Sequence, residues 1–155
     1  MARLKKGDSA PVIRLLDQNG NEQNLIDSRG EKMLVFFYPR AMTSGCTLQA
    51  QSVRDAKKQL AKLGVRVMGI SPDTPDKQKK FDDKYGLGYP LLSDTEHTAA
   101  ESFGVWGEKT VMGKKTEGII RSSFLIDENG RVMDSWYKVK PEDTVPKAIE
   151  ALKKK

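Results

Sequence analysis

Apolar positions along this chain follow two different periods, and segments of each kind alternate from one end to the other. The segment from Lys32 to Tyr38 is rich in Val and Phe, which predicts a central strand buried on both faces. Val65 to Ser71 predicts a second strand. Between the two strands, apolar residues recur at helical spacing until Gly64, and they are Val53, Ala56, Leu60 and Leu63. The pattern predicts a strand–helix–strand unit.

Strand–helix–strand units have a preferred hand, which fixes how the two strands lie. A right-handed crossover makes them parallel and places them in one sheet. The residues that follow Tyr38 therefore lie at the carboxyl end of the first strand, where open α/β sheets bind their ligands. Cys46, the only cysteine of the chain, lies in this stretch at the start of the predicted helix.

Two Asn-Gly pairs, Asn19-Gly20 and Asn129-Gly130, predict tight hairpins. The pair is a strong hairpin signal because the turn needs positive φ angles, which asparagine and glycine tolerate. The flanking strands are predicted at Ile13–Asp17, Glu22–Leu25, Ser122–Asp127 and Val132–Tyr137. We therefore expect a hairpin near the start of the chain and an antiparallel edge of the sheet near its end.

Three more helices and one more strand complete the pattern. Thr74 caps a helix that Gly86 ends, and Tyr89–Ser93 follows as a short strand. Thr98–Phe103 is a short helix. The last helix follows Pro141 and carries an apolar stripe of Val145, Ala148, Ile149 and Leu152. This alternation is typical of an α/β fold, and 155 residues suit a single domain spanning 1–155.

The charge pattern argues against nucleic-acid and membrane partners. The formal net charge is +6, but basic residues alternate with acidic ones, as in Arg54-Asp55, and the densest cluster is Lys153-Lys154-Lys155. No aromatic platform accompanies the charge, so we expect no nucleic-acid partner. The longest apolar run, Met33 to Tyr38, is far shorter than the roughly 18 residues of a membrane span. With no apolar leader at its start, the chain is expected to be cytoplasmic.

Cys46 carries the candidate chemistry. A lone cysteine is most often a small buried hydrophobe, and it cannot form an internal disulfide. At a helix start, however, free N–H groups and the positive end of the helix dipole favour a reactive thiolate. Pro39, Thr43 and Cys46 form the spacing Pro-x-x-x-Thr-x-x-Cys. A threonine one turn before the sulfur can hydrogen-bond an incoming oxygen, while a proline shields the pocket and exposes no N–H.

This spacing, with Tyr38 before it and Thr47 after it, resembles the active-site motif of the peroxiredoxins. The likeness is closest to the Q-type peroxiredoxins, also called bacterioferritin comigratory proteins. It extends over nearly the whole chain, in Gly7–Pro11, Leu91–Asp94, Phe103–Lys109, Met112–Lys114 and Arg121–Asp127. The resemblance implies a thioredoxin-like fold, with a central mixed sheet flanked by helices and an added N-terminal β-hairpin. It also implies a thiol-dependent peroxidase, without a cofactor, that reduces hydrogen peroxide and organic hydroperoxides.

In the implied reaction, the Cys46 thiolate attacks one peroxide oxygen and becomes a sulfenic acid while the other oxygen leaves. An ordinary cysteine is already a few per cent thiolate near neutral pH, so full ionisation raises the rate about thirtyfold at most. Most of the acceleration must come from donors aimed at the oxygens. We expect these donors to be Thr43 and the backbone N–H groups of Gly45 and Cys46. Arg121 is carried over from the family as the cation beside the sulfur.

The chain departs from the family where many Q-type members carry a resolving cysteine. Gln51 and Asp82 occupy those positions, and neither can condense with a sulfenic acid. We therefore expect a one-cysteine mechanism with an external thiol reductant, whether thioredoxin, glutaredoxin or a low-molecular-weight thiol. Ser44 replaces the proline usual before Gly45, so we expect the helix start to melt locally more easily than in relatives.

A second hypothesis makes Cys46 a peroxide sensor that passes its oxidation to a partner protein through a mixed disulfide. A thioredoxin-type oxidoreductase is disfavoured, because the chain lacks a Cys-x-x-Cys pair. We expect no metal site, since His97 is the only histidine and follows a polar surface loop. Trp106 and Met112 are expected to pack a loop near the pocket. We expect a monomer or a weak dimer.

Overall fold

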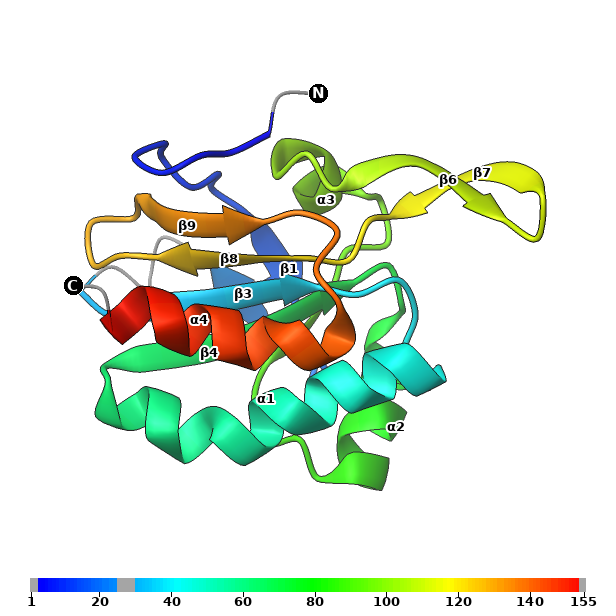
Figure 1. The fold of residues 1–155 in the computed structure, drawn as a ribbon. Coiled ribbons are helices and arrows are strands. Elements are labelled where there is room, and N and C mark those ends of the chain that lie inside the picture. Colours follow the sequence, from blue (N-terminus) through cyan, green and yellow to red (C-terminus); the bar gives the residue numbers. More distant parts are fainter. Residues whose placement is uncertain (1–2, 25–29, 154–155) are drawn as a thin grey trace.

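A central sheet organises the molecule, which we describe from a computed structural model over residues 3–24 and 30–153. The strands of the sheet are β1 (Arg14–Leu16), β2 (Glu22–Asn24), β3 (Lys32–Phe37), β4 (Val65–Ser71), β5 (Leu91–Ser93), β8 (Ser122–Ile126) and β9 (Val132–Trp136). The helices are α1 (Ser44–Lys62), α2 (Pro75–Tyr85), α3 (Thr98–Ser102) and α4 (Thr144–Lys153), with a 3-10 turn, η2 (Pro141–Asp143), before α4. Figure 1 shows helices on both faces of this sheet.

The sheet is mixed, as predicted. Its strand order is β2-β1-β5-β4-β3-β8-β9. The three central strands β5, β4 and β3 are parallel, while the pairs β1–β2, β1–β5, β3–β8 and β8–β9 are antiparallel. Both Asn-Gly hairpins are confirmed as β1–β2 and β8–β9, although Leu25, the predicted end of the first hairpin, lies outside the described residues.

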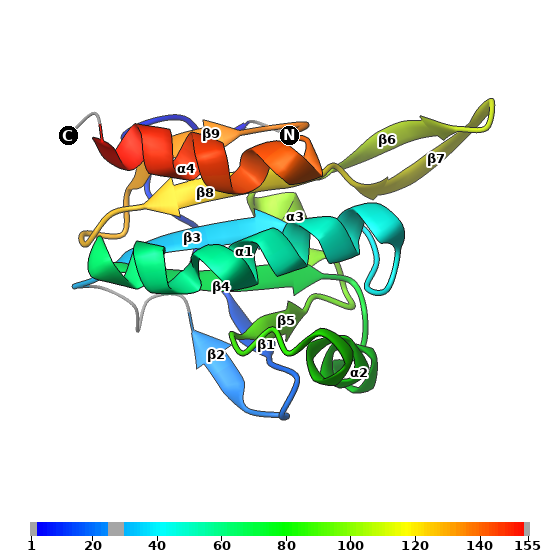
Figure 2. The same ribbon diagram turned by 60° about the horizontal axis from the view of Figure 1, so that its bottom comes forward.

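Strand β3 supplies side chains to a core on each face of the sheet. Leu34, Phe36 and Tyr38 pack against α1, α2 and α4, and the intervening residues of β3 pack against α3 and β8. Figure 2 shows α1 and α4 side by side across the sheet, with α3 behind it. Phe36 and Phe37 are fully buried, and each such side chain stabilises the fold by about 1.5–3 kcal/mol. The continuous apolar run of β3 therefore reflects the burial of this strand on both faces of the sheet.

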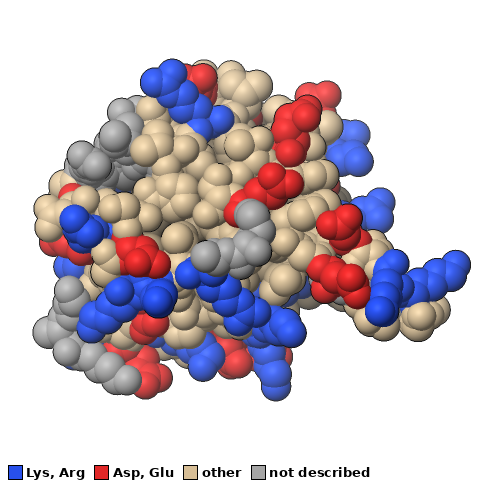
Figure 3. Space-filling model, turned by 90° about the horizontal axis from the view of Figure 1, so that it is seen from above, with Lys and Arg blue, Asp and Glu red and all other residues tan. Residues whose placement is uncertain are grey.

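A two-stranded arm projects from the body of the molecule, and the hydrophobic pattern does not predict it. It consists of β6 (Trp106–Val111) and β7 (Lys114–Ile119), which pair only with each other. Figure 3 shows lysines at its outer end and carboxylates nearer its base. The turn at Met112-Gly113 has φ angles of 52° and 79°, and methionine is not a residue that signals such a turn.

Three side chains differ from their predicted settings. Met112 is 98% exposed at the tip of the arm, so the prediction that it packs a loop near the pocket is wrong. Trp106, at the base of the arm, stacks on His97 with ring centroids 3.7 Å apart, which makes His97 half-buried rather than a free surface residue. Leu63 is 41% exposed because α1 ends at Lys62, so the buried stripe stops at Leu60.

Candidate active site

Cys46 lies in the first turn of α1, at the carboxyl end of β3. Thr43 is the extended N-cap residue, and the first helical bond runs from the Thr47 N–H to the Thr43 carbonyl, at 2.8 Å. The N–H groups of Gly45 and Cys46 precede that bond and therefore have no partner within the helix. The predicted position of Cys46 at a helix start is confirmed, and free amides and the helix dipole at such a start favour negative charge.

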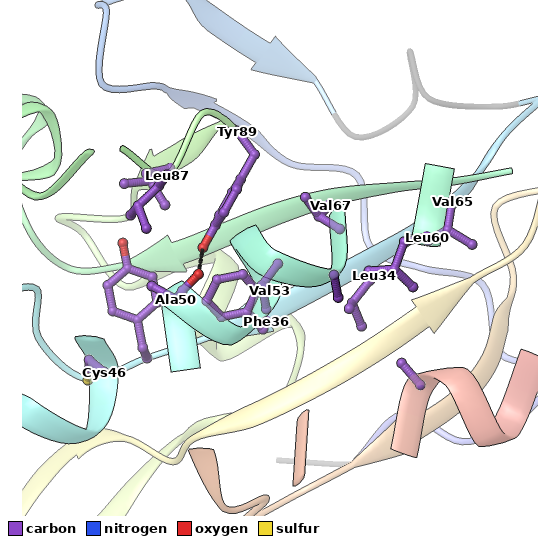
Figure 4. Close-up of a cluster of buried hydrophobic side chains, with 14 of the residues drawn as sticks. Leu34, Phe36, Cys46, Ala50, Val53, Leu60, Val65, Val67, Leu87 and Tyr89 are labelled. Atoms are coloured by element: carbon purple, nitrogen blue, oxygen red, sulfur yellow. Dashed lines mark hydrogen bonds between the residues drawn. The ribbon is translucent and has the colours of Figure 1, made fainter. Parts of the chain in front are cut away.

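The Cys46 side chain points inward. The residue is 1% exposed and joins the apolar cluster between α1 and the sheet, together with Tyr38 and Ala50. Figure 4 shows Cys46 at one end of this cluster, next to the first turn of α1. The sulfur is therefore sheltered from bulk water in this conformation.

Arg121 brings a permanent positive charge to this sulfur. Its Nη1 donates to Cys46 Sγ at 3.5 Å and to Gln49 Oε1 at 2.7 Å. Gly45 allows this approach: a Cβ atom built there would lie 3.2 Å from Arg121 Nη2 and 3.6 Å from Pro141 Cγ. The guanidinium thus lies over the first turn of α1. A side chain at position 45 would crowd it.

Gln49 links Arg121 to a second helix, and the sequence interpretation did not identify it. It is fully buried one helical turn after Cys46, and its Nε2 donates to Thr144 Oγ1 at 3.0 Å at the start of α4. The oxygen of the Gln49 amide therefore orients the Arg121 guanidinium, and its nitrogen anchors the Gln49 side chain to α4. The three-residue spacing from Cys46 was the available signal for this role.

Thr43 and Pro39 lie in the loop that joins β3 to α1. Thr43 is exposed, and its Oγ1 donates to the Arg40 carbonyl at 2.8 Å instead of capping the helix. Its hydroxyl proton is thus engaged, so in this conformation Thr43 is not the free donor that the sequence predicts. Its lone pairs remain able to accept from a peroxide O–H. Pro39 is half-buried just after β3 and contributes no N–H to the loop.

A second polar network holds the same loop from the end of β4. The Ala41 N–H donates to Asp73 Oδ2 at 2.7 Å, and the Ser71 hydroxyl donates to the same oxygen at 2.7 Å. Gln78 then joins Ser71 to the Tyr38 hydroxyl. Burial raises the pKa of the Tyr38 phenol far above its ordinary value, so this hydroxyl remains a protonated donor. The sequence interpretation did not identify Asp73, Ser71 or Gln78 as residues that hold this loop.

Different side chains occupy the two positions where many Q-type members carry a resolving cysteine. Gln51 is half-buried on α1, and Asp82 accepts from the Gly88 N–H at 2.9 Å and from Gln18 Nε2 at 3.1 Å. Within residues 3–24 and 30–153, no group of three metal-ligating side chains comes together. Over the same residues, no helix combines the length and the apolar character that crossing a membrane requires.

Comparisons with known proteins show which family the chain belongs to. The AhpC/TSA family matches residues 6–135. "Peroxiredoxin Bcp" from Escherichia coli strain K12 is 52% identical over 132 residues, which cover 85% of each protein. The crystal structure of the peroxidoxin BcpB from Mycobacterium tuberculosis has a TM-score of 0.86 and 35% identity, covering 97% of both chains.

A third similar protein has been studied for its chemistry. The bacterioferritin comigratory protein of Xanthomonas campestris, described for its alkyl peroxide reduction activity, has a TM-score of 0.86 and 30% identity, covering 91% of this chain and 90% of its own. The thioredoxin-like fold with an N-terminal hairpin is therefore confirmed. The chain belongs to the AhpC/TSA family and is a peroxiredoxin of the Bcp, or peroxiredoxin Q, kind: a peroxidase with a hydroperoxide as substrate and a thiol as reductant.

Proposed function

We propose that Cys46 is the peroxidatic nucleophile of this peroxidase, that Arg121, Thr43 and the first-turn amides stabilise the reacting oxygens, and that Pro39 shields the pocket. The observation that carries the proposal is the Arg121 Nη1 to Cys46 Sγ distance of 3.5 Å, in a sheltered first turn with unpaired N–H groups. A cation and helix N–H groups at one sulfur favour the thiolate, and the same donors suit the charge that develops on the peroxide.

The reaction balances as a displacement. The Cys46 thiolate attacks one peroxide oxygen, the O–O bond breaks, and the second oxygen leaves as hydroxide or alkoxide and takes up a proton. Sulfur is oxidised to the sulfenic acid and the peroxide is reduced to water or an alcohol. The Thr43 hydroxyl accepts from the peroxide O–H, while Arg121 and the amides of Gly45 and Cys46 donate to the oxygens.

An external thiol then restores the sulfur. Cys46 is the only cysteine, so a thiol from another molecule condenses with the sulfenic acid to give a mixed disulfide and water. A second thiol releases the Cys46 thiolate and forms a disulfide. Because Cys46 is 1% exposed, a bulky thiol reaches the oxidised sulfur only when the first turn of α1 opens.

Stopped-flow measurement of peroxide consumption tests the assignment. Wild-type protein with added thiol is expected to consume peroxide in many turnovers, and Cys46→Ser is expected to consume none. Arg121→Gln is expected to retain the fold but to lose about a hundredfold or more in the rate constant with peroxide. If the Cys46→Ser variant consumes peroxide at the wild-type rate, Cys46 is not the nucleophile.

A peroxide sensor also uses a single cysteine that forms a mixed disulfide with another molecule. Intact-mass measurement after one equivalent of peroxide, with candidate thiols added one at a time, distinguishes the two functions. A peroxidase is expected to return to the reduced mass with at least one of these reductants. Oxidised Cys46 that no added thiol restores, but that captures one protein, would favour the sensor.

A further inference from the structure

We propose that Asp73 is a positioning residue of the peroxidase reaction. Its carboxylate holds the Pro39–Thr43 loop, through the Ala41 N–H, in the turn that presents the Thr43 hydroxyl to the peroxide. This inference rests on the proposed roles of Cys46 and Thr43. Asp73 follows β4 and reaches the loop from outside the sequence motif that contains those residues.

The Asp73 carboxylate joins the end of β4 to the loop. One oxygen, Oδ2, accepts from the Ala41 N–H and from the Ser71 hydroxyl, both at 2.7 Å. Hydrogen bonds to an ionised carboxylate are about twice as strong as those between neutral groups. The bond to Ala41 is therefore a strong attachment of the loop to the end of β4.

The far side of this attachment is buried and fixed. Gln78 of α2 is fully buried, and its Nε2 donates to Ser71 Oγ at 2.8 Å and to the Leu92 carbonyl at 2.9 Å. Its Oε1 accepts from the Tyr38 hydroxyl. Asp73 is thus attached to a buried network that connects Tyr38, directly after β3, with β4, β5 and α2. Because this network is fixed, Asp73 can determine the position of the loop.

The loop itself needs such an anchor. Met42 has a φ of 72°, in the left-handed region that residues other than glycine rarely adopt, and such conformations persist only where their surroundings hold them. The Ala41 N–H bond lies immediately before Met42. The bond from Thr43 Oγ1 to the Arg40 carbonyl, at 2.8 Å, spans the same turn. The orientation of the Thr43 hydroxyl therefore depends on a turn that Asp73 holds.

A double-mutant cycle on the second-order rate constant of Cys46 with peroxide tests the inference. Asp73→Ala is expected to lower this rate constant by between about tenfold and a hundredfold, because a displacement of the order of 1 Å has effects of that size. In a Thr43→Val background the same substitution is expected to have little further effect, since the hydroxyl it positions is gone. If Asp73→Ala lowers the rate constant by the same factor in the wild-type and Thr43→Val backgrounds, the inference is overturned.

A second reaction of Cys46 separates positioning from general distortion. Alkylation by iodoacetamide uses the same sulfur but has no peroxide O–H for Thr43 to bind, so Asp73→Ala is expected to leave its rate unchanged or raise it. Equal losses in alkylation and peroxide reduction would overturn the inference. The matched control is Asp83→Ala on α2, an exposed carboxylate paired with Lys79 at 3.3 Å, which is expected to keep both rates within about twofold.

Asp73→Asn keeps the inference testable if the alanine variant fails to fold. The amide retains a neutral oxygen acceptor for the Ala41 N–H, so its peroxide rate constant is expected to lie between those of wild type and the alanine variant. It replaces Asp73→Ala in the cycle with Thr43→Val. A folded asparagine variant with the wild-type peroxide rate, or with factors that multiply independently, would overturn the inference. Inactive wild-type protein would instead refute the proposed peroxidase site.

Discussion

At the scale of single residues, a few atoms around one sulfur carry the chemistry. Arg121 contacts both Cys46 and Gln49, and Gln49 is fixed in turn by Thr144 of α4. The sequence pattern predicted the sulfur and its threonine, and the family resemblance supplied the arginine. Gln49 was missed because a buried glutamine on a helix has no motif of its own. Its three-residue spacing from Cys46 does not by itself identify Arg121, the partner that tertiary packing brings to it.

Gly45→Ala is a prediction at this scale. The new Cβ would lie 3.2 Å from Arg121 Nη2, the mobile end of a long side chain, so the guanidinium is expected to move away from the sulfur. Because alanine is favoured over glycine in helices by up to about 1 kcal/mol, the free energy of unfolding is expected to be unchanged or higher. The rate constant with peroxide tests the displacement of the guanidinium, and denaturant unfolding tests the free energy of unfolding. A variant that is less stable but fully active would contradict it.

At the scale of elements, local patterns predicted the helices and strands whose faces are buried. The stripe of α1 as far as Leu60, the apolar run of β3 and the two Asn-Gly hairpins are confirmed. The β6–β7 arm was missed because β7 is almost wholly exposed, so no alternation of burial appears in its sequence. The Asp73 anchor was missed because it joins two segments 32 residues apart in the chain.

The start of α1 supports a second prediction. Thr43 makes no side-chain cap, and Ser44 occupies the first helical position, where proline has the required φ and loses no hydrogen bond. Ser44→Pro is expected to stabilise the first turn by about 0.4–1 kcal/mol and to slow amide exchange there. Reduction of oxidised Cys46 by a bulky thiol is expected to slow as well. Exchange rates equal to those of wild type would contradict the expectation, and Ser52→Ala, further along α1, is the control.

At the scale of the whole molecule, the site lies where the carboxyl ends of β3 and β4 meet the start of α1. Helices α1 and α4 pack side by side over the sheet (Figure 2), and the Cys46 side chain of α1 belongs to the core cluster on this face. The arm lies outside this arrangement. Its strands pair with each other, and those residues between Glu108 and Glu117 whose side chains the structure describes belong to neither core cluster.

The arm is therefore expected to be dispensable for folding. Replacing residues 108–117 with Asn-Gly would join Gly107 to Gly118, which already lie opposite each other, through a two-residue hairpin. The free energy of unfolding is expected to change by less than about 1 kcal/mol, because an isolated two-stranded hairpin has little stability of its own. Urea unfolding of the shortened and full-length proteins measures this. A loss of several kcal/mol would show that the arm supports the core.

The rate constant of Cys46 with hydrogen peroxide, measured by stopped flow against free glutathione at the same pH, tests the central claim most directly. Donors preset around the sulfur are expected to make wild-type protein react about a hundredfold faster than glutathione, or more. Arg121→Gln is expected to lose most of that advantage. A wild-type rate equal to or below that of glutathione would mean that Cys46, 1% exposed, is a buried core residue, and would contradict the account.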